Sequence, residues 1–161
     1  MPYRLIPFAL ALLFLPLPLA WADITGHPRV IDGDTLEIDG QRIRLHGIDA
    51  PEGRQPCYRD GKPWRCGEGA ANALAGKIDR RPVTCKERGQ DRYGRTVAVC
   101  YADGEDLNAW MVAQGIALAY RRYSLDYVDQ EAGARAARHG VWSTTFERPW
   151  EWRRQRRKRQ P

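Results

Sequence analysis

The sequence predicts a small α+β domain, mainly β, in which five short strands form a barrel flanked by about three helices. Two observations predict this fold class. Five short strand-like segments are bounded by turn residues, and three longer segments rich in alanine or leucine have helical patterns. Because strands and helices are interleaved along the chain, we expect the helices to cover the ends of the barrel.

The first three predicted strands form a meander near the start of the domain. Residues 30–31, 35–38 and 42–45 are strand-like, and Asp-Gly between the second and third is a strong signal for a tight hairpin turn. Residues 83–86 and 96–101 supply two further strands. Five such strands are compatible with an OB-fold, a partly open barrel whose face and loops bind nucleotides or sugars.

Three segments are predicted to be helical. Residues 67–78 are rich in alanine and leucine, residues 107–114 carry apolar side chains at helical spacing before Gly115, and residues 127–139 are rich in alanine. Residues 53–66, which contain two prolines and two cysteines, are predicted to be an irregular loop. The segment lies between the last strand of the meander and the first helix.

Residues 1–22 have the pattern of a signal peptide. An early cation at Arg4 precedes an apolar run over residues 5–19, and a small-x-small sequence at 20–22 predicts cleavage before Asp23. The alternative is a membrane anchor, but the run is short for a bilayer span, contains three prolines and has no cationic stop after it. The mature protein is therefore expected to be secreted or periplasmic, without a transmembrane anchor.

The remaining chain divides by charge into a domain and a tail. Residues 148–161 hold seven Lys or Arg and one acid, a net charge of +6, which equals the formal charge of the whole chain. Residues 23–147 hold eighteen Lys or Arg and nineteen acids, a net charge of −1, and have the length of one domain. The tail could attract phosphates over long range or be a disordered solubilising segment, and the sequence leaves both open.

The four cysteines predict two disulfides, since their number is even and the chain has an export pattern. Cys85 and Cys100 flank a turn-rich stretch, so a hairpin would place them opposite each other. That pairing favours Cys85–Cys100 and leaves Cys57–Cys66 as a local bridge. A zinc site is the alternative, but the sequence has no CxxC pair and its three histidines show no ligand spacing.

Acidic and arginine residues alternate at the predicted strand ends and turns. Asp34, Asp49 and Glu52 together would form a hard-oxygen site suited to Ca²⁺ or Mg²⁺ and poorly suited to zinc. Arg44 and Arg95 are candidates for bidentate contacts to a phosphate, because the planar guanidinium matches two phosphate oxygens. A hard cation, a spare carboxylate and two arginines are what hydrolysis of a phosphodiester requires. The alternative is that these residues are ordinary turn and surface residues.

Several segments in one order resemble the signature segments of the staphylococcal nuclease family. They are residues 30–35, 43–45, 47–52 and 91–95, with sequences VIDGDT, IRL, GIDAPE and DRYGR. The likeness continues to the Val-Trp-Ser sequence that ends at residue 143, so it covers about residues 26–143, most of the mature chain. Dispersed motifs in one order are a specific signal.

The resemblance implies an OB-fold barrel with flanking helices and a Ca²⁺-dependent endonuclease that cuts DNA and RNA without strong sequence specificity and leaves 3′-phosphate ends. It also implies the site residues. Position by position, the carboxylates of Asp34 and Asp49 and the main-chain carbonyl of Ala50 would bind Ca²⁺, Asp32 would support the metal site, Glu52 matches the proposed general base, and Arg44 and Arg95 match the phosphate-binding arginines.

The chain departs from the family pattern in two places. Ala50 stands where the family often has threonine, but the ligand there is a backbone oxygen, so alanine should serve. The insert at residues 53–66 could shape substrate access. Tyr93 matches a position that lines the nucleotide pocket, where an aromatic ring stacks on any base. Tyr120 and Tyr123 could do the same or be packing residues.

Other readings of the sequence remain open. His46 lies among the site residues but is expected to be structural, because it has no catalytic counterpart in the family. A non-catalytic nucleic-acid-binding module is the main alternative function, and the presence of all five family site residues argues against it: Asp34, Arg44, Asp49, Glu52 and Arg95. A peripheral protein held on anionic lipids or cell-wall polymers by its basic tail is a weaker alternative. Nothing demands more than a monomer or implies a stable protein partner.

Overall fold

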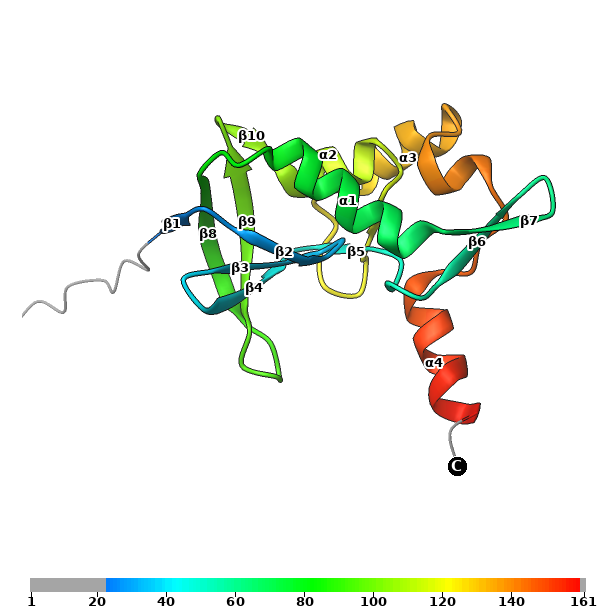
Figure 1. Ribbon diagram of the computed structural model, residues 1–161, viewed down its shortest axis with the longest axis horizontal. Coiled ribbons are helices and arrows are strands. Elements are labelled where there is room, and N and C mark those ends of the chain that lie inside the picture. Colours follow the sequence, from blue (N-terminus) through cyan, green and yellow to red (C-terminus); the bar gives the residue numbers. More distant parts are fainter. Residues whose placement is uncertain (1–22, 160–161) are drawn as a thin grey trace, which may run out of the picture.

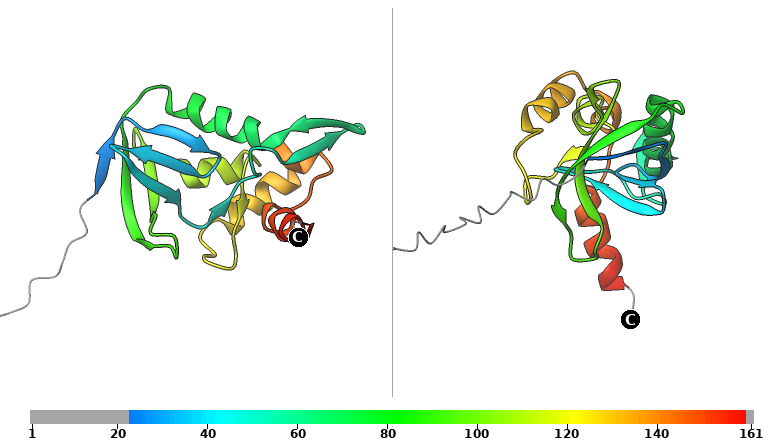
Figure 2. Two further views of the ribbon diagram at one scale, coloured as in Figure 1. Left: turned by 60° about the horizontal axis from the view of Figure 1, so that its bottom comes forward. Right: turned by 90° about the vertical axis from the view of Figure 1, so that its left-hand side faces the viewer.

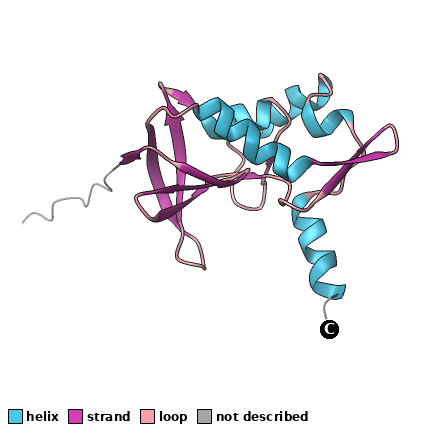
Figure 3. Cartoon of the chain, in the orientation of Figure 1, coloured by secondary structure: helices cyan, strands magenta, loops and turns pink. Residues whose placement is uncertain are grey.

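The computed structural model describes residues 23–159, so the expected signal peptide at residues 1–22 lies outside the described part of the chain. These residues form a mixed α+β structure with a seven-stranded main sheet, two small two-stranded sheets and four α-helices (Figures 1 and 3). Between residues 23 and 159, no helix is both long and apolar enough to cross a membrane.

The main sheet contains the five expected strands and two more. The expected strands are β2 (Arg29–Asp32), β3 (Thr35–Ile38), β4 (Gln41–Leu45), β8 (Val83–Gln90) and β9 (Thr96–Ala102). The additional strands are β1 (Ile24–Gly26) and β10 (Glu105–Asp106), which are too short to show an alternating pattern in the sequence. The prediction of five strands was therefore too low.

The strand order is β1-β8-β9-β4-β3-β2, with β10 paired to β9. Neighbouring strands are antiparallel except β4 and β9, which are parallel. No pairing among the described residues joins β2 back to β1, so the expected barrel is not closed. Because β4 pairs with β9, the site segment in β4 lies beside the β8–β9 hairpin.

Strand β4 shows how the core orients the site. Ile43 and Leu45 are buried in the core with Leu36 and Ile38 of β3. Burying such a side chain stabilises the fold by roughly 1.5–3 kcal/mol. Because successive side chains point to opposite faces of a strand, Arg44 lies on the face away from this core.

The three predicted helices are present as α1 (Cys66–Ile78), α2 (Leu107–Ala113) and α3 (Val128–Ala136), and they gather along one side of the sheet (Figure 3). Buried Asn108 of α2 donates to the carbonyls of His46 and Ala98 and accepts from the N–H of Cys100. This side chain therefore joins α2 to β9 and to the end of β4.

A fourth helix, α4 (Pro149–Arg159), occupies the segment that the sequence analysis treated as a tail. Proline is favoured at the first helical position, and Glu151 in the first turn and four basic residues in the last turn suit the helix dipole. Helix α4 and the β8–β9 hairpin project to the same side of the molecule (Figures 1 and 2). The alternative of a disordered tail is therefore wrong for residues 149–159, which are helical.

The expected irregular loop at residues 53–66 is instead a hairpin of β6 (Pro56–Arg59) and β7 (Lys62–Arg65). Asp60 and Gly61 form its turn with positive φ, an Asp-Gly signal that the two prolines obscured. Both expected disulfides are present. Cys57–Cys66 closes this hairpin onto α1, and Cys85–Cys100 joins residues paired directly across β8 and β9.

The start of α4 is held by a small second core. Its buried members are Cys57, Cys66, Leu118 and Val141, and Trp142 and Trp150 are among the side chains packed against it. Leu118 belongs to β11 (Leu118–Ala119), which pairs with β5 (Ile48–Asp49) in the second small sheet. This core therefore brings α4 close to the strand that carries Asp49.

Candidate active site

Asp34 lies in the tight turn between β2 and β3, where it is buried. The Asp32 carboxylate accepts the backbone N–H of Asp34 at 3.0 Å and stabilises the turn. A Cβ atom at Gly33 would lie 2.7 Å from the side chains of Ala50 and Ala70, so only glycine lets the turn pack this closely. As a result, the Asp34 carboxylate accepts the N–H of Ala50 at 2.7 Å.

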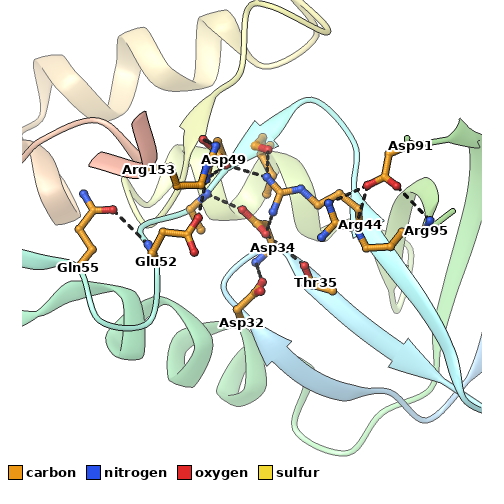
Figure 4. Close-up of polar contacts among 12 residues, drawn as sticks. Asp32, Asp34, Thr35, Arg44, Asp49, Glu52, Gln55, Asp91, Arg95 and Arg153 are labelled. Atoms are coloured by element: carbon orange, nitrogen blue, oxygen red, sulfur yellow. Dashed lines mark hydrogen bonds and ion pairs between the residues drawn. The ribbon is translucent and has the colours of Figure 1, made fainter. Parts of the chain in front are cut away.

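Arg44 joins two carboxylates from different segments of the chain (Figure 4). One nitrogen, Nη1, pairs with Asp34, and Nη2 lies 2.7 Å from Oδ1 of Asp49 and 3.3 Å from the carbonyl of Ile48. Asp49 has no solvent-exposed surface, so its charge requires a close positive partner. The structure thus brings together Asp34, Arg44 and Asp49, three of the residues that the sequence analysis named.

Glu52 follows Asp49 on a segment fixed by backbone contacts. Its N–H donates to the buried Gln55 side chain at 3.1 Å, and its carbonyl accepts from the N–H of Gln55 at 2.7 Å. A Cβ atom at Gly67 would overlap the Glu52 carbonyl, so the start of α1 rests directly against this segment. The Glu52 side chain is 37% exposed, which gives it access to water.

Sequence reasoning missed Arg153, which reaches the site from α4 (Figure 4). Its Nη1 donates to Glu52 at 2.6 Å and to Oδ1 of Asp49 at 3.0 Å, and its Nη2 donates to Oδ2 of Asp49 at 2.7 Å. Burial alone would lower the pKa of Arg153, but the two carboxylates outweigh it and raise that pKa. No pattern in the arginine-rich sequence distinguishes Arg153 from its neighbours.

Arg95 lies at the end of the β8–β9 turn and is held by Asp91 at 2.7 Å. Burial opposes ionisation of Asp91, but Arg95 and the backbone N–H groups of Arg95 and Tyr93 outweigh it and lower the pKa of Asp91 below its usual value. Tyr93 is 71% exposed at the tip of the hairpin, and the guanidinium groups of Arg92 and Arg95 lie over its ring. The pair Asp91–Arg95 is separate from the contacts of Arg44.

One open cleft of about 590 Å³ is lined by all but one of the predicted site residues. Asp49 does not line it, because Arg44 and Arg153 cover its buried carboxylate. His46, expected to be structural, also lines the cleft and lies 3.1 Å from Asp126. The other lining residues named by the sequence analysis are Asp32, Asp34, Arg44, Ala50, Glu52, Tyr93, Arg95, Tyr120 and Tyr123.

Oxygen atoms of the kind that a hard cation binds lie in this cleft and directly beneath it. Asp34 and Asp49 offer carboxylate oxygens joined by one guanidinium, and the carbonyl of Ala50 belongs to the adjacent segment. Within residues 23–159, no three His, Cys, Asp or Glu side chains are clustered so as to hold a metal ion. The guanidinium groups of Arg44 and Arg153 lie between the carboxylates instead.

Fold and site together define an α+β protein whose cleft presents arginines above buried carboxylates, an arrangement suited to a phosphate group. The family model described as "Staphylococcal nuclease homologue" matches residues 42–144, more than half of the chain. The chain therefore belongs to the staphylococcal nuclease family.

Individual relatives agree with this membership. The chain is 36% identical over 165 residues to a micrococcal nuclease of Shigella flexneri, an alignment covering 91% of this chain and 89% of that protein. It is 36% identical over 153 residues to an uncharacterized endonuclease of Escherichia coli O157:H7, with 89% and 94% covered. It is also 40% identical over 123 residues to the succinoglycan biosynthesis protein ExoI of Rhizobium meliloti (strain 1021), covering 74% of this chain but 64%, just under two thirds, of that protein.

Proposed function

We propose that the protein is an endonuclease that hydrolyses phosphodiester bonds of DNA and RNA without strong sequence specificity. The observation that carries the proposal is the single cleft that Arg44, Arg95 and Glu52 all line, above buried Asp34 and Asp49. The names of two relatives, a micrococcal nuclease and an endonuclease, support it. The products are 3′-phosphate ends, as the family resemblance implies.

Arg44 and Arg95 bind the phosphate in this mechanism. Each guanidinium can donate two parallel hydrogen bonds to phosphate oxygens, and both are already held by carboxylates, Arg44 by Asp34 and Asp49 and Arg95 by Asp91. Preorganised donors of this kind stabilise the charge that develops on the phosphate in the transition state. The exposed ring of Tyr93 stacks on a nucleotide base without regard to its identity.

Glu52 accepts the proton of the attacking water. Its partly exposed carboxylate is oriented by Arg153 and by the contacts of its backbone with Gln55. The water oxygen forms a bond to phosphorus as the bond from phosphorus to the 5′ oxygen breaks, and the departing 5′ oxygen takes a proton from solvent, which leaves a 3′-phosphate and a 5′-hydroxyl. General base catalysis of this type contributes typically about 10²–10⁴-fold in rate.

The proposed cofactor is Ca²⁺. The carboxylates of Asp34 and Asp49 and the main-chain carbonyl of Ala50 would hold the ion, and Asp32 would support them through the turn at Gly33. When bound, the ion neutralises charge on a phosphate oxygen. Because Asp49 and Glu52 share Arg153 in the structure, these carboxylates retain a positive partner before any cation binds.

The proposal includes the site of action and the partners. The signal-peptide pattern of residues 1–22 and the two disulfides favour a secreted or periplasmic protein. We expect a monomer whose partners are its DNA and RNA substrates. The alternative is a non-catalytic binding module, which would use the same arginines but would not need Glu52.

Digestion of single-stranded DNA by the purified mature chain tests the proposal. The DNA is incubated with Ca²⁺, with Mg²⁺ in its place, and with chelator, and the ends of the products are analysed. We expect cutting with Ca²⁺ that chelator abolishes, and 3′-phosphate ends. Protein that binds DNA but does not cut it with any metal would favour the binding module.

A further inference from the structure

Helix α4 forms one wall of a second groove beside the cleft. This arginine groove has a volume of about 450 Å³ and lies between α4, the loop after β11, and α3. Eight arginines line it, and Glu131 is the single acid among its lining residues. The groove is therefore strongly positive, although the domain over residues 23–147 has a net charge of −1.

Most of these arginines have no carboxylate partner. Arg121 pairs with Glu131 at 2.7 Å, and Arg153 pairs with Asp49 and Glu52. Like charges gathered in this way repel each other, so an anion in the groove would relieve the repulsion. Six arginines form no ion pair within residues 23–159: Arg92, Arg122, Arg135, Arg148, Arg154 and Arg157.

Aromatic rings fix the walls of the groove. The guanidinium of Arg135 lies 5.6 Å from the ring centre of Trp142, and that of Arg148 lies 5.7 Å from Trp150. Trp150 in turn stacks on Tyr120, with 5.2 Å between ring centres. A guanidinium held over a ring keeps its N–H groups free for phosphate oxygens.

The arginine groove is continuous with the cleft. Five residues line both: Arg92, Tyr120, Tyr123, Arg153 and Arg157. Arg153 joins the two, because its ion pairs with Asp49 and Glu52 hold the first turns of α4 at the mouth of the cleft. A polynucleotide strand with one phosphate at Arg44 could therefore pass directly into the groove.

We propose that the arginine groove binds the phosphates of a single-stranded DNA or RNA segment that flanks the bond held in the cleft. The inference rests on the proposed function, since it extends the substrate path of that site. Arg154 and Arg157 are the binding residues on α4, and Arg153 is a positioning residue. Continuity with the cleft favours a nucleic acid over an anionic lipid surface.

Helix α4 offers a matched pair of variants. Arg154 and Arg157 line the arginine groove, whereas Arg156 and Arg159 line a different hollow beside β6. The double variants Arg154→Gln/Arg157→Gln and Arg156→Gln/Arg159→Gln remove the same charge from the same helix. All four side chains are exposed, so both variants should fold, and melting curves confirm this.

Binding is measured with oligothymidylates of 4 and 16 nucleotides in the presence of a chelator, so that the measurement does not depend on hydrolysis. For the 16-mer, Arg154→Gln/Arg157→Gln should weaken binding on the order of tenfold and reduce the slope of log affinity against log salt by about 1.4, or about 0.7 per lost contact to a single strand. The loss should be smaller for the 4-mer. The control variant should change the affinity less than about twofold.

Equal weakening by both variants would overturn the proposal, because it would mean long-range attraction by α4 as a whole. Unchanged binding in both variants, or no binding of the 16-mer by the unmodified protein, would also overturn it. Binding to phosphatidylglycerol vesicles is measured in parallel, and an effect of Arg154→Gln/Arg157→Gln on vesicle binding alone would overturn it as well. A protein that binds as expected but does not cut DNA with Ca²⁺ would refute the proposed hydrolysis and leave the groove supported.

Discussion

At the scale of residues, the site is an alternation of buried carboxylates and arginines. Asp49 has no exposed surface and lies between the guanidinium groups of Arg44 and Arg153. In a buried ion pair, the attraction between the charges offsets the cost of removing them from water only if both partners are present. Removal of one partner leaves an uncompensated buried charge. The same arrangement sets a competition between Arg153 and any cation for the oxygens of Asp49.

Arg153→Gln should therefore make the protein depend more on Ca²⁺ for its stability. In chelator we expect the free energy of unfolding to fall by about 1–3 kcal/mol, because Asp49 loses one of its two cationic partners. Added Ca²⁺ should raise the melting temperature more in this variant than in the unmodified protein, because the freed carboxylate oxygens bind the ion more tightly.

Thermal melts with and without Ca²⁺ measure both effects. Arg156→Gln is the control, since the Arg156 guanidinium lies over the ring of Trp152 and not among the carboxylates. Equal Ca²⁺-induced shifts in all three proteins would show that Arg153 does not compete with a cation.

At the scale of elements, the start of α1 supports the segment that carries Glu52. Gly67 leaves no room for a Cβ atom, because the carbonyl of Glu52 and the N–H of Gly53 occupy that space. Gly76, in the same helix, has nothing within 4 Å of the place where a Cβ atom would lie. Packing therefore requires glycine at position 67 but not at position 76.

Alanine substitution at each of these two positions tests this difference. Gly67→Ala should destabilise the protein by about 1–3 kcal/mol through overpacking and should slow cleavage, because Glu52 must shift. Gly76→Ala should stabilise the protein by roughly 0.5–1 kcal/mol, since alanine is the better helix former. Denaturant unfolding and cleavage rates measure both. A Gly67→Ala protein as stable and active as the unmodified one would contradict the packing described here.

Some elements of the structure were predicted from the sequence, and others were not. Strand-like patterns and the Asp-Gly turn predicted β3 and β4, and the family resemblance named residues that line the cleft, among them Arg44, Glu52 and Arg95. The sequence did not predict α4, because its arginine-rich surface has no apolar periodicity, and its position depends on Trp150 and Arg153 contacting distant segments. Contacts between residues about 100 positions apart leave no local pattern.

At the scale of the whole molecule, the disulfides hold the two parts of the site. Cys85–Cys100 joins the strands that carry Arg95, and Cys57–Cys66 joins the hairpin after Glu52 to α1. A disulfide stabilises a fold mainly by restricting the unfolded chain. Both bridges are expected to persist in an oxidising compartment.

Reduction should lower the free energy of unfolding by about 2–4 kcal/mol for each bridge that opens. Melting curves with and without a thiol reductant measure this, with free thiols titrated to show which bridges have opened. An unchanged melting temperature after complete reduction would show that the bridges contribute little to the fold.

The proposed hydrolysis requires Glu52 to take the proton of the attacking water. The most direct measurement is the initial rate of oligonucleotide cleavage with Ca²⁺ by Glu52→Gln, beside Glu68→Gln, an exposed glutamate of α1 outside the cleft. Glu52→Gln should lower the rate about 10²–10⁴-fold with an unchanged melting temperature, while Glu68→Gln should cut at the normal rate. Near-normal cleavage by Glu52→Gln would rule out this role of Glu52.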